Sequence, residues 1–429
     1  MKFRFILSVI LILNACQTDQ TPDSDKKGKE IEKSFQDVDS LLKLDNGKFW
    51  GRQLYGPILF VDRDTRKLYA NENNPDETFK KVSAYYTDSL PVEINMANTA
   101  FSWKGKRWSM VMLPLPEDKF TRNTLLIHEL FHRIQPEIGF DNIPQTDNSH
   151  LDIYEGRLLL KLELEALIKA LVTTDDVRKN HITNALLFRT YRHKSEDIKT
   201  SENALELNEG LAEYTAVMLS GRDQKEMINH FSESKSQFYN NPTFVRSFAY
   251  QTIPMYGYLL SLQDMHWHKE TNDKTNLTDI FMSSFQITPE KETTLEDIAL
   301  EYSYNEIRKY EQEREEKRLK KITDLKLKFI DSPVLEIIFE NMNISFDPRN
   351  LTPLEEYGTV YPNLRITDNW GILTVENGSL MSSDWSMLRV SAPNKITDSL
   401  VKGDGWSLEL KPNWTIQAIG DSFKLIKEL

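Results

Sequence analysis

The chain has 429 residues, of which 39% are hydrophobic, and its formal net charge at pH 7 is −12. This length exceeds that of one average domain and suits two. The acidic balance argues against a nucleic-acid partner, because phosphate binding needs a concentrated basic surface. The single cysteine, Cys16, excludes a disulfide framework within the chain.

The N-terminal segment has the pattern of a secretory signal. Lys2 and Arg4 precede an apolar run, Phe5–Leu13, that is too short to cross a bilayer as a helix. The Leu-Asn-Ala-Cys ending at Cys16 resembles the bacterial lipobox, whose cysteine is acylated and becomes the new N-terminus. An ordinary secretory signal with a chance cysteine is the alternative. We expect residues 1–16 to be a lipoprotein signal peptide and the protein to be lipid-anchored in the cell envelope, in the periplasm or at the cell surface.

A polar segment and a strand-rich stretch come next. Residues 17–40 are mostly polar and charged, which predicts a disordered tether between the lipid and the folded protein. Apolar runs at 56–61, 91–94 and 108–113 predict strands. The segment 100–108 contains a Lys-Gly-Lys turn between two aromatic-rich runs, and it predicts a hairpin.

From about residue 120 the spacing of apolar residues becomes helical. The predicted helices cover Arg122–Gln135, Leu151–Leu171, Asp175–His193 and Ser201–Ser220. A heavily charged helix is expected over residues 294–326. Short strands with turn signals after about residue 365 predict a small all-β module.

The first of these helices carries the sequence His128-Glu129-Leu130-Phe131-His132. Histidines at positions i and i+4 project from one helical face about one turn apart, so both imidazoles can bind one Zn²⁺. Glu129 lies one residue further round, where it can accept a proton from water without displacing a ligand. The alternative is a pair of buried histidines with Glu129 as their partner. Apolar neighbours on nearly all sides make unpaired charge costly, which favours a metal ion.

A zinc site that stays open to water needs a third protein ligand. Glu209 shares a helix face with Ala212 and Ala216, which indicates a carboxylate buried against a neighbouring helix. Glu213, at i+4, points nearly the same way and can orient a ligand histidine from outside the ligand set. The alternative is one solvated acidic face made of Glu202, Glu206, Glu209 and Glu213.

The two motifs resemble those of the gluzincins, the zincin metallopeptidases of the thermolysin and aminopeptidase-N type. In that family a later helix supplies a glutamate, often within Asn-Glu-Gly-hydrophobic-Ala, and Asn208–Ala212 matches this motif residue for residue. The resemblance covers about residues 90–260. It implies one Zn²⁺ per chain, held by His128, His132 and Glu209, with Glu129 as the general base.

The resemblance also departs from the family. Between His132 and Glu209 lie 76 residues, far more than the short connection usual in aminopeptidase-N-like enzymes, and this puts the substrate class in doubt. The family places a sheet-edge strand beside the cleft, for which the hairpin at 100–108 is the candidate, with a plain structural hairpin as the alternative. It also uses a tyrosine to stabilise the oxyanion, for which Tyr250 is the candidate and Tyr256 and Tyr258 are alternatives.

These features imply an α+β fold with two parts. The first is a zincin-like catalytic domain over residues 41–335, a small β-sheet followed by helices, and the second is the small β module over residues 345–429. We expect a zinc metallopeptidase that acts on a peptide or protein substrate. A non-catalytic zinc-containing surface lipoprotein that binds peptide or glycan is the main alternative, and a zinc hydrolase of non-peptide amides is another. An intact Glu129 favours catalysis, because a purely structural site needs no base.

Overall fold

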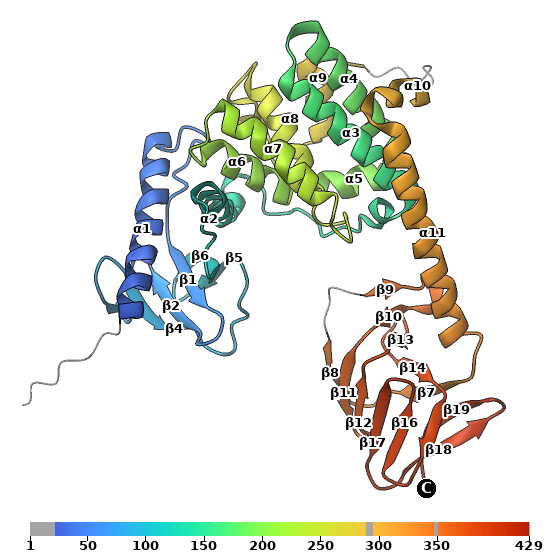
Figure 1. The fold of residues 1–429 in the computed structure, drawn as a ribbon. Coiled ribbons are helices and arrows are strands. Elements are labelled where there is room, and N and C mark those ends of the chain that lie inside the picture. The colour runs from blue at the N-terminus through green and yellow to red at the C-terminus, as the bar shows by residue number, and fades with distance from the viewer. Residues whose placement is uncertain (1–21, 289–294, 347–350, 429) are drawn as a thin grey trace, which may run out of the picture. The chain divides into compact units, whose positions relative to one another are not determined.

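The computed structural model of the chain describes residues 22–288, 295–346 and 351–428 (Figure 1). The chain forms two compact units that divide between Arg308 and Lys309. The first unit combines a small sheet with helices, and the second consists mainly of strands, so the predicted mixed α and β composition is confirmed. Cys16 lies outside the described residues. Within the described ranges, no helix is both long and apolar enough to cross a membrane.

Helix α1, Pro22–Asp45, corrects the prediction of a disordered tether over residues 17–40 from Pro22 onward, and residues 17–21 lie outside the described residues. Apolar residues at helical spacing form one buried face of α1, and they are Ile31, Phe35, Val38 and Leu42. Phe35 stacks on Phe60 of the sheet with ring centroids 4.4 Å apart. The charged composition of the segment hid this periodic apolar stripe, which is enough to fix a helix against a core.

The sheet of the first unit has six strands in the order β3-β4-β2-β1-β6-β5. Their bounds are β1 Ile58–Asp62, β2 Lys67–Ala70, β3 Lys80–Lys81, β4 Tyr86–Ser89, β5 Thr99–Trp103 and β6 Lys106–Leu113. Strands β1 and β6 are parallel and the other pairs are antiparallel. The predicted hairpin is confirmed as β5 and β6, and β5 is the edge strand of the sheet.

One predicted strand of this region is wrong. Residues 91–94 form a turn, in which the backbone N–H of Ile94 donates to the carbonyl of Pro91 at 3.1 Å. The guanidinium of Arg66 donates to both carbonyls of that turn. The turn therefore satisfies its backbone locally and through a side chain, without a neighbouring strand.

Apart from α1, the helices of the first unit follow the sheet in sequence. They are α2 Lys119–Ile134, α3 Tyr154–Val172, α4 Asp175–Arg192, α5 Glu196–Leu205, α6 Leu211–Leu219, α7 Gln224–Phe238, α8 Ala249–Ser261, α9 Leu277–Phe285 and α10 Leu295–Ala299. Shorter turns of helix are η1 Gln135–Ile138, η2 Ser149–Asp152, η3 Glu206–Gly210, η4 Trp267–Glu270 and η5 Leu300–Tyr302. Helix α2 lies between the sheet and the other helices, contacting both β6 and α6 (Figure 1).

The second unit is a pair of sheets that share one core. Their orders are β18-β19-β7-β14-β13-β10-β9 and β15-β16-β17-β12-β11-β8. The strands are β7 Val334–Ile338, β8 Asn343–Phe346, β9 Thr352–Pro353, β10 Thr359–Tyr361, β11 Leu364–Asp368, β12 Gly371–Val375, β13 Ser379–Met381, β14 Met387–Ser391, β15 Pro393–Ile396, β16 Leu400–Gly403, β17 Trp406–Leu410, β18 Trp414–Ile419 and β19 Ser422–Lys427, with the helical turn η7 Glu355–Tyr357. Leu388 of one sheet and Leu373 of the other belong to the same buried cluster. The predicted all-β character of this region is confirmed.

The charged helix α11, Tyr304–Phe329, accounts for a difference in the domain boundary. The sequence predicts a first domain that ends near residue 335, whereas the two units divide at Arg308. Phe329, at the end of α11, is fully buried against Leu354 and Leu380 of the β region. Most of this helix therefore belongs to the second unit, because its last turn contributes to the core there.

Candidate metal centre

The HExxH helix, α2, is fixed at its start and against the sheet. Asp118 caps it by accepting a hydrogen bond from the Thr121 backbone N–H at 2.8 Å. Ser109 of β6 donates to the carbonyl of Glu129 at 2.8 Å, inside the core. The apolar side of the helix is buried, so the side chains of His128 and His132 project from the opposite side into a cavity.

The three predicted ligands lie together in the structure. His128 Nε2 and His132 Nε2 are 3.0 Å apart, and Glu209 Oε2 lies 3.3 Å from the first and 3.4 Å from the second. A ligand atom from each of the three residues lies within 4.8 Å of the other two. His132 and Glu209, with 76 residues between them in the sequence, thus belong to one compact donor set.

Glu213 fixes the tautomer of His128. His128 Nδ1 lies 2.9 Å from Glu213 Oε2, and an ionised carboxylate can only accept a hydrogen bond. The ring proton of neutral His128 therefore sits on Nδ1, which leaves a lone pair on Nε2 facing the other two ligand atoms. The sequence predicts this orienting place for Glu213, beside a ligand histidine and outside the ligand set.

Gln135 fixes the tautomer of His132 in the same way. Its amide nitrogen donates to the carbonyls of Leu207 and Asn208, at 3.3 and 3.1 Å, so its amide oxygen faces His132 Nδ1 at 2.7 Å. His132 must donate to that oxygen, and its Nε2 then also carries a lone pair. Sequence reasoning missed Gln135. A glutamine just after a helix gives no signal of its contacts with Leu207 and Asn208, which lie 72 and 73 residues away.

The donor set fits a divalent cation such as Zn²⁺. When both imidazoles are neutral, in these tautomers, two nitrogen lone pairs and a carboxylate oxygen converge, and none of the three atoms carries a proton to offer the others. Burial alone lowers the pKa of His128, but Glu209 and Glu213 raise it to about 10. The site therefore requires positive charge, supplied by a proton or a metal ion that compete for the same lone pairs. Two histidines and a glutamate form a ligand set typical of zinc sites with an open position.

Glu129 lies beside this set, and one of its carboxylate oxygens has no hydrogen-bond partner in the described part of the chain. Its side chain is 5% exposed, and this oxygen, Oε2, is buried. Burial raises the pKa of Glu129, and the charge of His128 and His132 opposes that rise. The carboxylate lines the cavity and is free to accept a proton from a molecule bound there.

Tyr250, on α8, lies directly over the site. Its hydroxyl donates to Glu209 Oε2 at 2.5 Å, and its ring is nearly parallel to that of His128 with centroids 5.4 Å apart. Burial and the Glu209 carboxylate raise the pKa of Tyr250, so the phenol keeps its proton. The two alternative tyrosines lie elsewhere, since the hydroxyl of Tyr256 donates to buried Glu163 and Tyr258 is a core residue.

The segment carrying Glu209 is not the single helix that the sequence predicts over 201–220. It consists of α5, the π-helical turn η3 and α6. A π turn inserts one residue into the helical repeat, and such turns often occur at functional sites. Gly210 lets α8 approach, because a Cβ there would lie 2.5 Å from Cγ1 of Ile253. This close packing brings Tyr250 next to Glu209.

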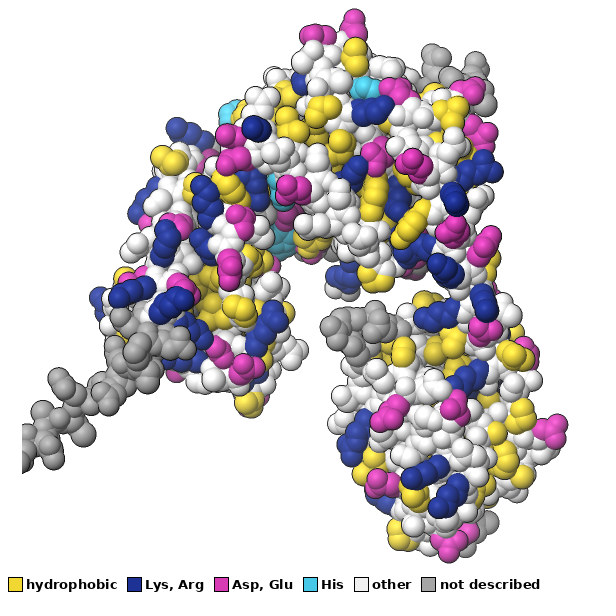
Figure 2. Space-filling view, in the orientation of Figure 1, with side chains coloured by type: hydrophobic (Ala, Val, Ile, Leu, Met, Phe, Trp, Pro, Cys, Tyr) yellow, Lys and Arg dark blue, Asp and Glu magenta, His cyan; other side chains and the backbone are white. Residues whose placement is uncertain are grey.

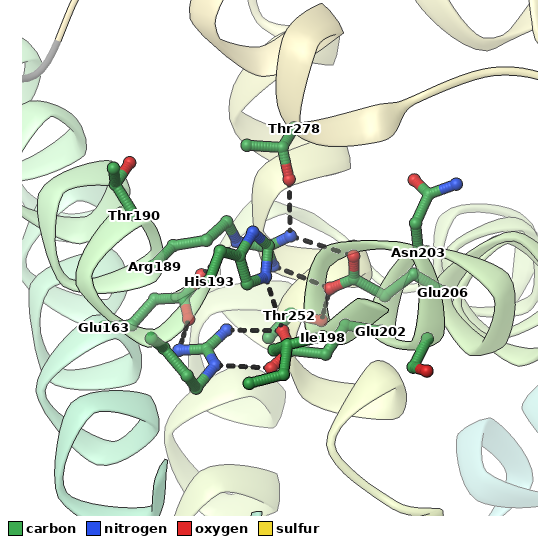
Figure 3. A network of polar contacts seen from close by, with 12 residues as sticks. Glu163, Arg189, Thr190, His193, Ile198, Glu202, Asn203, Glu206, Thr252 and Thr278 are labelled. Carbon is green, nitrogen blue, oxygen red and sulfur yellow. Dashed lines mark hydrogen bonds and ion pairs between the residues drawn. The ribbon is translucent and has the colours of Figure 1, made fainter. Parts of the chain in front are cut away.

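A buried ion-pair network contacts η3 through Glu206 (Figure 3). Both Nη atoms of Arg189 donate to the Glu206 carboxylate, at 2.9 and 2.6 Å, and Thr252 of α8 donates to the same carboxylate at 2.6 Å. Nε of Arg189 donates to Glu163 at 2.6 Å. The network thus joins the turn that carries Glu209 to the helix that carries Tyr250.

Arg192 extends this network. It binds Glu202 through Nε and Nη2 at 2.7 and 2.8 Å, and its Nη1 lies 2.6 Å from Glu163 Oε2. Glu202 and Glu206 are at most 1% exposed, which rules out the alternative of one solvated acidic face. Sequence reasoning missed the arginines of this network, although charged residues within otherwise apolar helices are a usable signal of buried pairing.

The site opens into a cavity of about 740 Å³. Its walls include the face of α2 from Thr121 to His132, the β5 residues Thr99 and Ala100, and Arg222. Edge strand β5 therefore lies beside the cavity, whereas Trp108 on β6 is buried in the core. On the face that Figure 2 presents, histidine side chains lie next to acidic ones in the first unit.

Comparisons of this chain with protein-family models, with curated proteins and with solved structures found no match. The family resemblance therefore rests on the two motifs.

Proposed function

We propose that the first unit is a zinc-dependent hydrolase of the gluzincin type that cleaves peptide bonds. The observation that carries this proposal is the convergence of His128, His132 and Glu209 beside the unpartnered carboxylate of Glu129. A purely structural zinc site is closed by four protein ligands, whereas here three ligands face a cavity. A base placed next to an open site is typical of hydrolytic zinc enzymes.

The residues divide the chemistry among them. Zn²⁺ at such a site supplies a Lewis acid that lowers the pKa of water to about 7. Glu129 accepts the proton of the attacking water and can pass it to the leaving amine. Glu213 and Gln135 keep both imidazoles in the tautomer that presents Nε2. Tyr250 keeps its proton, and by exchanging its hydrogen bond to Glu209 it can donate to the substrate oxygen as negative charge develops there.

The cavity and the sheet edge support a peptide as substrate. Strand β5 pairs with β6 on one side only, so its outer backbone groups have no strand partner among the described residues. An extended peptide can add to such an edge through backbone hydrogen bonds. Thr99 and Ala100 of this strand line the cavity together with Glu129, so a peptide added to β5 would have a peptide bond near the base.

We also propose that the protein is held at the membrane of the bacterial cell envelope through a lipid on Cys16. The proposal rests on the lipobox-like sequence that ends at this sole cysteine. Replacing it by Cys16→Ser should abolish lipid labelling and release the protein from the membrane fraction. Unchanged labelling and fractionation would contradict the anchor.

A peptide-library digest tests the proposed activity. Purified protein should cleave peptides, lose this activity with a chelator and regain it when Zn²⁺ is restored. The Glu129→Gln variant serves as the matched negative control, because it retains the metal ligands and lacks only the general base. If the zinc-loaded protein cleaves nothing in a broad library, or if Glu129→Gln cleaves as fast as wild type, the proposal is wrong.

A further inference from the structure

Arg222 forms part of the cavity wall in the short connection between α6 and α7. Its Nη1 donates to Thr124 Oγ1 at 2.8 Å and to Ser220 Oγ at 2.7 Å. Its guanidinium also lies over the ring of Phe120, 5.2 Å from the ring centroid. These contacts hold the guanidinium in one orientation, and none of them supplies a negative charge.

The other edge of this guanidinium, Nε and Nη2, is unused. In the described ranges the hydrogen bonds of Arg222 are those of Nη1, and the carboxylates of Asp118, Glu213 and Glu226 act on its charge without forming an ion pair with it. Arg192 uses the equivalent Nε–Nη2 edge to bind both oxygens of Glu202, at 2.7 and 2.8 Å. Two parallel N–H donors match the two oxygens of a carboxylate, so Arg222 offers the same fork to a molecule in the cavity.

The position of Arg222 indicates how far its free Nε–Nη2 edge lies from the metal centre. Its partner Thr124 precedes His128 by four residues, so the two side chains lie on the same face of α2, and both line the cavity. Four residues of an α-helix correspond to a rise of about 6 Å along its axis. An extended peptide advances about 3.3–3.6 Å per residue, so this distance spans one to two residues of substrate.

His230, on α7, also lines the cavity and does not add a competing charge. Burial and the nearby charge of Arg222 lower the pKa of His230 to about 4, so its imidazole is neutral at pH 7. A neutral imidazole can donate one hydrogen bond to an anion that Arg222 binds. The fixed positive charge at this end of the cavity therefore comes from Arg222.

We propose that Arg222 is a specificity-determining residue that binds a substrate carboxylate within one or two residues of the cleaved bond. This inference rests on the proposed function, because it names the class of peptide that the zinc centre would cleave. The carboxylate belongs either to a free C-terminus or to an acidic side chain. Both present the same two oxygens to the fork, and the substrates below distinguish them.

The direct test measures binding without hydrolysis, by calorimetry on the zinc-loaded Glu129→Gln protein. One pair of acetylated peptides ends in a free carboxylate or in an amide, and a second, amidated pair contains glutamate or glutamine. In at least one pair, the acidic member should bind about 10-fold or more tightly, as expected for a charge-assisted hydrogen bond. Adding Arg222→Gln should remove the preference. Adding Lys225→Gln, which removes an equal charge from an exposed residue outside this cavity, should preserve it.

The outcomes separate this inference from the proposed function. Equal affinity within both pairs, or a preference that survives Arg222→Gln, overturns the carboxylate site even if the wild-type protein cleaves peptides. An Arg222-dependent preference in a protein that cleaves nothing supports the site and overturns the proposed function. If Arg222→Gln does not fold, Arg222→Lys retains the charge without the fork and should still reduce the preference severalfold.

Discussion

The first unit contains two clusters of buried charge that differ in whether the chain neutralises them itself. Around Arg189 and Arg192, every carboxylate meets a guanidinium, and the cluster is sealed from solvent (Figure 3). Around His128, two imidazole lone pairs and the Glu209 carboxylate face one another and a cavity. The charged groups of the closed cluster have partners within the chain, whereas the open cluster has room for a proton or a metal ion from outside it. The comparison predicts different consequences when each is damaged.

The largest effect is expected at the base of the open cluster. Glu129→Gln should lower peptide cleavage about 10²–10⁴-fold, the usual contribution of a general base. Zinc content should not change, because Glu129 is not in the ligand set. Glu209→Gln should instead lose zinc affinity, since a neutral amide poorly replaces a ligating carboxylate. If Glu129→Gln loses the metal, or Glu209→Gln holds it as tightly as wild type, the two roles are assigned wrongly and Glu213 becomes the candidate ligand.

Breaking the closed cluster should instead reduce stability. Arg189→Met leaves Glu206 and Glu163 buried without their main partner, and this should lower the free energy of unfolding by about 3–5 kcal/mol. Urea denaturation followed by fluorescence measures the change. The control Lys43→Met breaks the exposed Asp39–Lys43 pair on α1 and should leave stability nearly unchanged. Equal effects of the two variants would refute the distinction between the clusters.

A smaller effect is expected for the residues that orient the ligands. Glu213→Ala and Gln135→Ala remove the acceptors of His128 Nδ1 and His132 Nδ1. Loss of such orienting partners typically costs about 10–100-fold in metal affinity. Competition with a fluorescent zinc chelator measures this. Unchanged affinity in both variants would show that the tautomers are not held by these contacts.

The smallest expected effect is a change in the acid stability of the closed cluster. Burial opposes ionisation, but Arg192 and its neighbours keep the pKa of Glu202 well below its usual range, and Glu163 is also lowered. The stabilisation is therefore complete above the unfolded pKa of about 4.3 and is lost as pH falls through the lower folded values. In Glu202→Gln the free energy of unfolding should fall less steeply with pH below about 4.3, as denaturation at several pH values can measure. Identical slopes in the two proteins would contradict the assignment.

The sequence was most informative where a residue's role depends on local spacing. The i, i+4 histidines and the Asn-Glu-Gly motif sufficed to select His128, His132 and Glu209, which the structure brings together. The place of Glu213 followed from its position one turn beyond Glu209. Helix α2 and the β5–β6 hairpin were likewise predictable, because their apolar periods and turn residues are local.

The features that could not be predicted from the sequence include contacts between segments that are distant in the chain. Gln135 acts through carbonyls on η3, and Arg189 meets Glu206 across two helices. No spacing rule links such residues. Helix α1 was missed because its charged composition outweighed a sparse apolar stripe, and the π turn was missed because a one-residue insertion leaves the helical pattern almost unchanged.

The most direct test of this account is the zinc content of protein purified without chelators. Metal analysis should find about one Zn²⁺ per chain, as a three-ligand centre of this kind holds. The His128→Ala variant, which removes one Nε2 lone pair and keeps Glu129, should lose most of that zinc while remaining folded. A wild-type protein that contains no zinc and takes none up, or a His128→Ala variant that retains a full equivalent, would contradict the claim that the open cluster is a metal centre.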